Sequence, residues 1–150
     1  MSDLLAGEQL QLQDGSKVDA GDFLKDKIVG LYFSAGWCPP CRNFTPKLKR
    51  FYEAIKEKHS NFEIVFVSRD KEEEDLNEYF NDHHGEWTTI PFGSPKIQEL
   101  LAKYEVKTIP AMRVVKADGA VVVQDARTEV QEKGSDAEEL YEEWETFFNM

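Results

Sequence analysis

Cysteine is scarce in this chain, and basic charge is in deficit. Only two of the 150 residues are cysteines, and 18 lysines and arginines stand against 29 aspartates and glutamates, which gives a formal net charge of −11. An acidic chain repels nucleic-acid phosphates and anionic lipid surfaces, so we expect neither as a direct partner. No apolar run approaches the roughly 20 residues that a membrane-spanning helix needs.

The chain also lacks the marks of secretion. Residues 1–7 carry no basic segment and no long apolar segment, so they do not have the pattern of a signal peptide. We therefore expect a monomer in the cytoplasm or the nucleus, where a cysteine pair is more often catalytic than structural. The length predicts a single domain over residues 1–150, with a core large enough to fold without disulfide bonds.

Apolar periodicity predicts an α/β domain in which strands and helices alternate. Strands are expected at residues 9–13, 28–33, 61–68, 111–115 and 120–124, and helices at 19–24, 39–55, 72–83, 94–104 and 134–148. The order favours parallel strands first and an antiparallel hairpin at the end of the sheet, with helices on both faces.

Capping residues indicate where these helices begin and end. Asp70 and Ser94 are expected to cap the helices that follow them, and Gly85 to end the first of these. Ser135 and Glu138 have the spacing of a capping box, which predicts the start of the last helix.

The two cysteines, Cys38 and Cys41, lie three residues apart at the junction between an apolar strand and a helix. This order places Cys38 beside the helix N-terminus, where unpaired N–H groups and the helix dipole stabilise a thiolate. Cysteines so placed have pKa values of roughly 3.5–7.5, which makes them nucleophiles near neutral pH. Cys41 lies one turn further on, as a resolving thiol does. Pro39 and Pro40 pre-set the first helical turn.

Two other interpretations of the pair remain open. Zinc requires about four ligands, whereas the chain has no second cysteine pair and only three histidines, His59, His83 and His84. The helix dipole explains the last two, which are expected at a helix end. The pair is otherwise two inert core residues, although burial does not explain the intervening prolines.

The motif and its flanks resemble those of the thioredoxin superfamily. The residues that carry the resemblance are Trp37-Cys38-Pro39-Pro40-Cys41, Pro46, and Ile109-Pro110 before the final hairpin. With Arg42, Phe44-Thr45, residues 62–68 and residues 85–92, the chain is most similar to the tryparedoxin and nucleoredoxin branch, and nucleoredoxin-like proteins above all. The resemblance implies a thioredoxin fold, with a central mixed β-sheet flanked by helices on both faces.

The resemblance also implies a thiol–disulfide oxidoreductase with no metal and no cofactor beyond its own cysteine pair. Cys38 would attack disulfide-containing protein substrates, Cys41 would release the reduced product, and an external thiol reductant would restore the dithiol. The alternative is a redox-sensing module that binds signalling partners, as nucleoredoxins do.

Further site residues follow from the resemblance. Pro110 matches a cis-proline, which leaves the backbone of Ile109 open to an extended substrate segment. Trp37 and Pro110 would form an apolar docking rim, to which Trp87 belongs unless it packs in the core. Arg127 matches an arginine near the site in relatives, and a solvent-exposed role is the alternative.

Two positions depart from the family patterns. Tyr32 stands six residues before the first cysteine, where thioredoxins have a buried aspartate, so we expect water or a nearby glutamate to accept the proton of Cys41. An aromatic residue there is typical of the tryparedoxin branch. Glu86 precedes Trp87 where tryparedoxins have a proline, which argues against recognition specific to trypanothione.

Overall fold

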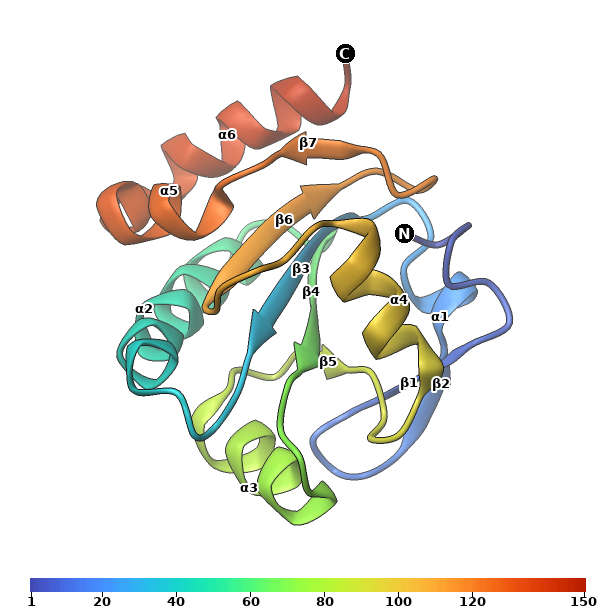
Figure 1. Ribbon diagram of the computed structural model, residues 1–150. Coiled ribbons are helices and arrows are strands. Elements are labelled where there is room, and N and C mark those ends of the chain that lie inside the picture. The colour runs from blue at the N-terminus through green and yellow to red at the C-terminus, as the bar shows by residue number, and fades with distance from the viewer.

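The computed structural model describes residues 1–150, and its centre is one mixed β-sheet (Figure 1). The strands are β1 (Gln9–Gln11), β2 (Lys17–Asp19), β3 (Ile28–Ser34), β4 (Phe62–Ser68), β5 (Thr88–Thr89), β6 (Ala111–Val115) and β7 (Val121–Val123). They lie in the order β2-β1-β5-β4-β3-β6-β7. Strands β3 and β4 are parallel, and β6 and β7 form an antiparallel hairpin at one edge, as the sequence predicts. The expectation that parallel strands come first is wrong for β1, which pairs antiparallel with both β2 and β5.

Helices cover both faces of this sheet, which confirms the expected architecture. They are α1 (Ala20–Phe23), α2 (Pro39–Lys56), α3 (Glu73–His83), α4 (Pro95–Lys103), α5 (Ala126–Lys133) and α6 (Ala137–Phe148), with a 3₁₀ turn, η1 (Gly134–Asp136), between the last two. Helices α2, α3, α5 and α6 pack on one face, and α1 and α4 pack on the other (Figure 1). No helix is both long enough and apolar enough to cross a membrane.

The central strands β3 and β4 are buried along their whole length. Successive side chains of a strand point to opposite faces. In β3, Tyr32 therefore belongs to the core under α2, while Leu31 and Phe33 belong to the core under α4. Burial on both faces explains why the strand is apolar from Ile28 to Phe33.

Some helix ends differ from the sequence predictions. The Ser94 hydroxyl accepts a hydrogen bond from the Lys96 N–H at 3.2 Å, which confirms that cap. The expected cap by Asp70 is wrong, because α3 begins only at Glu73 and Asp70 makes its hydrogen bonds elsewhere. Helix α3 ends at His83 as predicted, but its C-cap residue is His84 and not Gly85.

The start of the last helix was also predicted wrongly. Helix α6 begins at Ala137, and no side chain caps it. The Glu138 carboxylate lies 2.7 Å from the His59 ring instead of folding back on the helix. The capping box between Ser135 and Glu138 is therefore absent.

Strand β2 and helix α5 are two of the short elements that were not predicted. Strand β2 pairs with β1 over three residues, which is too short for an apolar pattern to show. Helix α5 buries only Ala126 and Val130, so its periodicity is weak, and it starts with Asp125 accepting from the Thr128 N–H at 3.4 Å. Both elements are stabilised by the elements they pack against, and their own sequences carry no clear apolar pattern.

Replacing Phe51 should test the core beneath α2. Its ring lies 5.2 Å from that of Trp144 and is 1% exposed, so Phe51→Ala should lower the free energy of unfolding by about 3–5 kcal/mol. The matched control is Phe147→Ala, because Phe147 is 49% exposed and its loss should cost about 0.5 kcal/mol. Urea denaturation measures both, and equal losses would contradict this packing.

Candidate active site

The two cysteines lie where the sequence places them, at the start of α2. Cys38 is the N-cap residue, and its sulfur accepts a hydrogen bond from the Cys41 N–H at 3.4 Å. Both are free thiols, with Cys38 5% exposed and Cys41 fully buried. Pro39 and Pro40 form the first residues of the helix, where their missing N–H groups leave nothing unsatisfied. An anion on Cys38 would therefore face the positive end of the helix dipole.

The loop before Cys38 is held by side chains from other elements. The Gly36 N–H donates to the Asp70 carboxylate at 2.9 Å, and the Arg42 side chain donates to the Gly36 carbonyl oxygen. The Trp37 indole N–H donates to the carbonyl oxygen of Arg69 at 3.3 Å. A Cβ at Gly36 would lie 3.1 Å from the Cβ of Tyr79, so a side chain there would require Tyr79 to move by a few tenths of an ångström.

Sequence reasoning missed the role of Asp70. Its carboxylate also accepts a hydrogen bond from the Ser68 hydroxyl at 2.7 Å, and the residue is 9% exposed. Strands β3 and β4 are parallel and end side by side, at Ser34 and Ser68. An acidic residue two positions beyond β4 was therefore a signal for a contact with the cysteine loop.

The peptide bond between Ile109 and Pro110 is cis, as the resemblance implies. The Cys38 sulfur lies 3.8 Å from the carbonyl oxygen of Ile109. The N–H of Ile109 donates to no backbone carbonyl. The backbone beside Cys38 thus offers an unused donor to an extended peptide.

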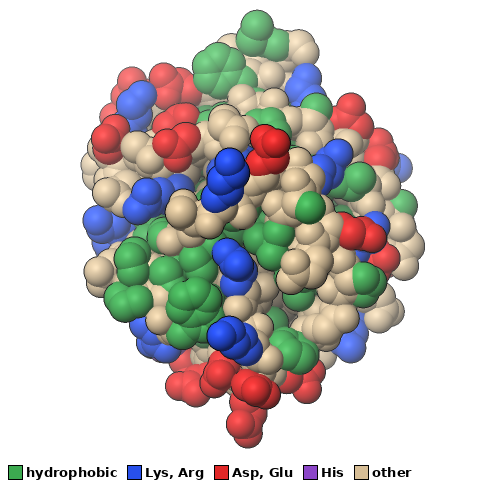
Figure 2. Space-filling model, viewed as in Figure 1, with side chains coloured by type: hydrophobic (Ala, Val, Ile, Leu, Met, Phe, Trp, Pro, Cys, Tyr) green, Lys and Arg blue, Asp and Glu red, His purple; other side chains and the backbone are tan.

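An apolar surface surrounds the thiol of Cys38. Trp37 is 57% exposed, Pro39 and Pro40 are exposed, and Ile109 is half-buried. Figure 2 shows hydrophobic side chains gathered on the face where, in Figure 1, the β3–α2 connection and the start of β6 lie. Trp37 is exposed as the expected docking rim requires, whereas Pro110, the other residue expected in that rim, is buried.

Trp87 does not belong to that rim. It is 1% exposed, its ring packs 5.2 Å from that of Tyr52, and its indole N–H donates to Nδ1 of His84 at 3.0 Å. A buried side chain cannot meet a substrate, so the docking role is wrong and the alternative of core packing is confirmed.

His84 is likewise a core residue, and the helix-dipole interpretation is wrong for it. The side chain is buried against the rings of Phe66 and Tyr79. Burial holds the pKa of His84 well below its usual value, with a smaller contribution from the charge of His83. The imidazole is therefore neutral at physiological pH and acts as the acceptor for Trp87.

Arg127 is half-buried at the start of α5. With Pro110, Arg113 and Lys107 it lines a hollow of about 400 Å³. The Nε atoms of Arg113 and Arg127 are buried and have no hydrogen-bond partner. Glu105 and Asp125 also line this hollow, so its lining carries charges of both signs.

The environment of Cys41 differs from the one expected. Burial raises the pKa of Cys41 to about 12, helped by the hydrogen bond with Cys38, while the Ser34 hydroxyl and the Ala35 backbone act in the opposite direction. No carboxylate is among these influences, so of the two expected proton acceptors, water and a glutamate, the glutamate has no support here. Tyr32 is buried, and its hydroxyl lies 2.6 Å from that of Thr45.

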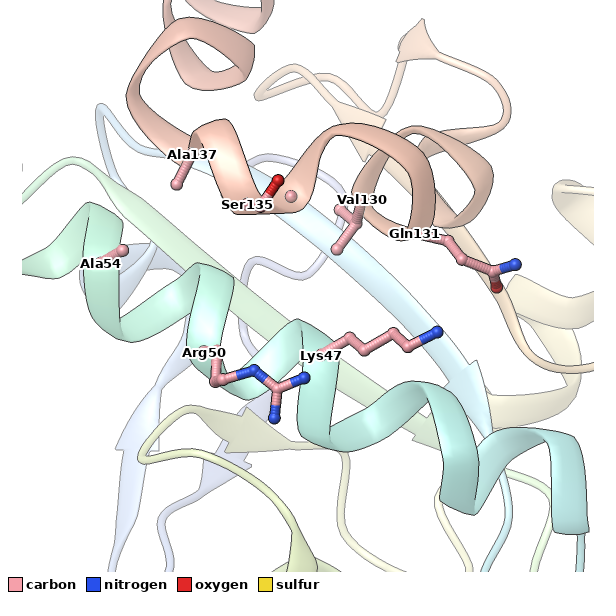
Figure 3. Close-up of a pocket in the computed structure, with 8 residues that line it drawn as sticks. Lys47, Arg50, Ala54, Val130, Gln131, Ser135 and Ala137 are labelled. Atoms are coloured by element: carbon pink, nitrogen blue, oxygen red, sulfur yellow. The ribbon is translucent and has the colours of Figure 1, made fainter.

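A larger cavity of about 480 Å³ lies elsewhere on α2 (Figure 3). Lys47 and Arg50 project from α2, and Gln131 and Ser135 lie on the segment that faces it. Neither cysteine lines this cavity. No three His, Cys, Asp or Glu side chains are grouped so that they could hold a metal ion.

Comparison with known proteins identifies the family. Residues 26–121 match the family model described as thioredoxin-like. The chain belongs to the thioredoxin-like family. This thioredoxin-like chain is 41% identical over 133 residues to tryparedoxin of Trypanosoma brucei brucei, with 85% of this chain and 88% of that protein covered. The crystal structure of thioredoxin from Wuchereria bancrofti superposes with a TM-score of 0.84 at 51% identity, covering 87% and 90% of the two chains.

Nucleoredoxins are relatives of a different length. The probable nucleoredoxin 1 of Arabidopsis thaliana is 40% identical over 131 residues, which is 87% of this thioredoxin-like chain. The chain spans 22% of that protein's length. These findings confirm the thioredoxin fold and the tryparedoxin and nucleoredoxin branch.

The neutral, buried His84 predicts a dependence of stability on pH. Because its pKa is lowered in the folded protein, its contribution is fully present above about pH 6.5 and is lost as the pH falls below that value. His84→Gln keeps an acceptor for Trp87. It should lower the slope of the free energy of unfolding against pH by up to about 1.4 kcal/mol per pH unit. Urea unfolding between about pH 5 and pH 7.5 measures it. The control His83→Gln, at an exposed position, should keep the slope.

Proposed function

We propose that this protein is a thiol–disulfide oxidoreductase that reduces protein disulfides through Cys38 and Cys41. The observation that carries the proposal is a free dithiol at the N-cap of α2, with one sulfur beside the cis peptide of Ile109 and Pro110. A helix N-terminus stabilises the thiolate, which is the reactive form of cysteine.

In the first step the Cys38 thiolate attacks one sulfur of a substrate disulfide. A bond forms between Cys38 and that sulfur, the substrate S–S bond breaks, and the other substrate sulfur leaves and takes up a proton. The N–H of Cys41 and the first turn of α2 favour the anionic state of Cys38 before the attack.

In the second step Cys41 attacks the Cys38 sulfur. The bond between Cys38 and the substrate breaks, a Cys38–Cys41 disulfide forms, and the substrate is released as a thiol. The protein is thereby oxidised by two electrons. An external thiol reductant must return them, and no further cofactor is required.

Substrate docking is assigned to the apolar surface around Trp37. An aromatic side chain held in place by a hydrogen bond, as Trp37 is by the carbonyl of Arg69, loses little freedom on binding. The unpaired N–H of Ile109 would pair with an extended substrate backbone. Arg127 would act from the neighbouring hollow by attracting acidic residues that flank the disulfide.

Loss of the Cys38 sulfur should abolish the activity. In an insulin-reduction assay with dithiothreitol, Cys38→Ser should give a rate no greater than dithiothreitol alone, because no thiolate remains at the helix N-cap. A wild-type rate equal to that of Cys38→Ser would refute the proposal.

Cys41→Ser serves as the partner variant, because it keeps the attacking sulfur and removes the resolving one. It should accumulate mixed disulfides at Cys38 with many proteins. A single partner that binds without either cysteine would instead support the redox-sensing module.

Truncating Trp37 should weaken docking without changing the thiol chemistry. Trp37→Ala should lower kcat/KM for a protein disulfide about tenfold, since exposed aromatic anchors dominate binding energy. The rate of Cys38 alkylation by iodoacetamide should stay within about twofold of wild type. Phe147→Ala, also an exposed aromatic residue, is the control and should leave both quantities unchanged.

A further inference from the structure

Four buried hydroxyl groups form a hydrogen-bonded chain under the cysteine loop. The Ser34 hydroxyl lies 2.6 Å from that of Tyr79, Tyr79 lies 2.6 Å from Thr45, and Thr45 lies 2.6 Å from Tyr32. None of the four side chains is more than 1% exposed. They come from β3, α2 and α3, so tertiary packing brings them together.

The direction of these hydrogen bonds follows from counting hydrogens. A hydroxyl has one hydrogen and two lone pairs. Thr45 donates its hydrogen to the carbonyl oxygen of Cys41 at 2.8 Å, so it accepts from Tyr32 and Tyr79. Tyr79 has then used its hydrogen and accepts that of Ser34. Ser34 keeps a free lone pair, and its hydroxyl acts to lower the pKa of the thiol of Cys41, the residue whose carbonyl oxygen accepts from Thr45.

This inference rests on the proposed function. We propose that hydrogen bonds in the hydroxyl chain reverse their direction when Cys41 ionises in the resolving step. Ser34 turns its hydrogen to the Cys41 sulfur, Tyr79 donates to Ser34 in its place, and Thr45 stays hydrogen-bonded to Tyr32. The hydroxyl chain thus stabilises the Cys41 thiolate by donating a hydrogen bond to it, whereas a buried carboxylate would accept the proton of the Cys41 thiol. Ser34, which would donate to the reacting sulfur, is assigned as the catalytic residue.

The remaining hydroxyls are positioning residues that act through Ser34. Burial raises the pKa of both Tyr32 and Tyr79, so each keeps its hydrogen at neutral pH and remains a donor. A hydrogen bond to a charged acceptor is roughly twice as strong as one between neutral groups. The chain therefore favours the thiolate over the thiol without placing a charge in the core.

The protons balance without an added base. The bond between Cys38 and the substrate sulfur breaks as the bond between Cys38 and Cys41 forms. The proton that Cys41 loses is taken up by the departing substrate thiolate, directly or through water. All four hydroxyls keep their hydrogens throughout, and the only oxidation is that of the two cysteines.

Stopped-flow reaction of the reduced protein with dithiobis(nitrobenzoate) separates the two thiols. The first nitrothiobenzoate ion released reports attack by Cys38, and the second reports attack by Cys41. In Ser34→Ala and in Tyr79→Phe the first phase should stay within about twofold of wild type. The second should slow about tenfold and move to higher pH by about one unit.

Tyr141→Phe is the matched control. Tyr141 is also buried and hydrogen-bonded, to Asn61 at 2.8 Å, but it lies outside the hydroxyl chain, so both phases should remain unchanged. Near-ultraviolet circular dichroism checks that each variant is folded.

A second phase that keeps its rate and pH dependence in Tyr79→Phe would overturn the inference, as would equal slowing of both phases. Failure of the proposed function would look different, because the wild-type first phase would then be no faster than that of an ordinary free thiol.

Discussion

The parallel pairing of β3 with β4 is the constraint on which the site depends. Their register sets Ser34 opposite Ser68, so the segments that follow the two strands leave the sheet at the same edge. The segment after β4 then supplies the carboxylate of Asp70 and the carbonyl of Arg69 to the segment after β3. Without this pairing, the turn that presents Cys38 at the start of α2 would lose the partners of the Gly36 N–H and of the Trp37 indole.

Local features of the site were predictable, and features that join distant segments were not. The strand, the proline pair and the helix start lie within a few residues of Cys38, so the sequence alone located the thiols. The cis bond before Pro110 was inferred only through the family resemblance. The buried positions of Trp87 and His84, and the contact made by Asp70, depend on segments that meet only in the folded chain.

The hydroxyl chain shows the same limit. In the sequence, Tyr32 is notable only because it replaces the aspartate that thioredoxins have at this position. Nothing nearby in the sequence indicates that Thr45 and Tyr79 surround it. In the structure these residues fill the space beneath Cys41 with neutral donors. Keeping formal charge out of a fully buried region avoids a large desolvation penalty, which a carboxylate at this position would incur.

The exposure of Trp37 has an optical consequence. The chain has three tryptophans, and Trp87 and Trp144 are at most 1% exposed whereas Trp37 is 57% exposed. A soluble quencher therefore reaches one indole, the neighbour of the reactive sulfur. Intrinsic fluorescence of the unlabelled protein thus reports directly on what covers its cysteine loop.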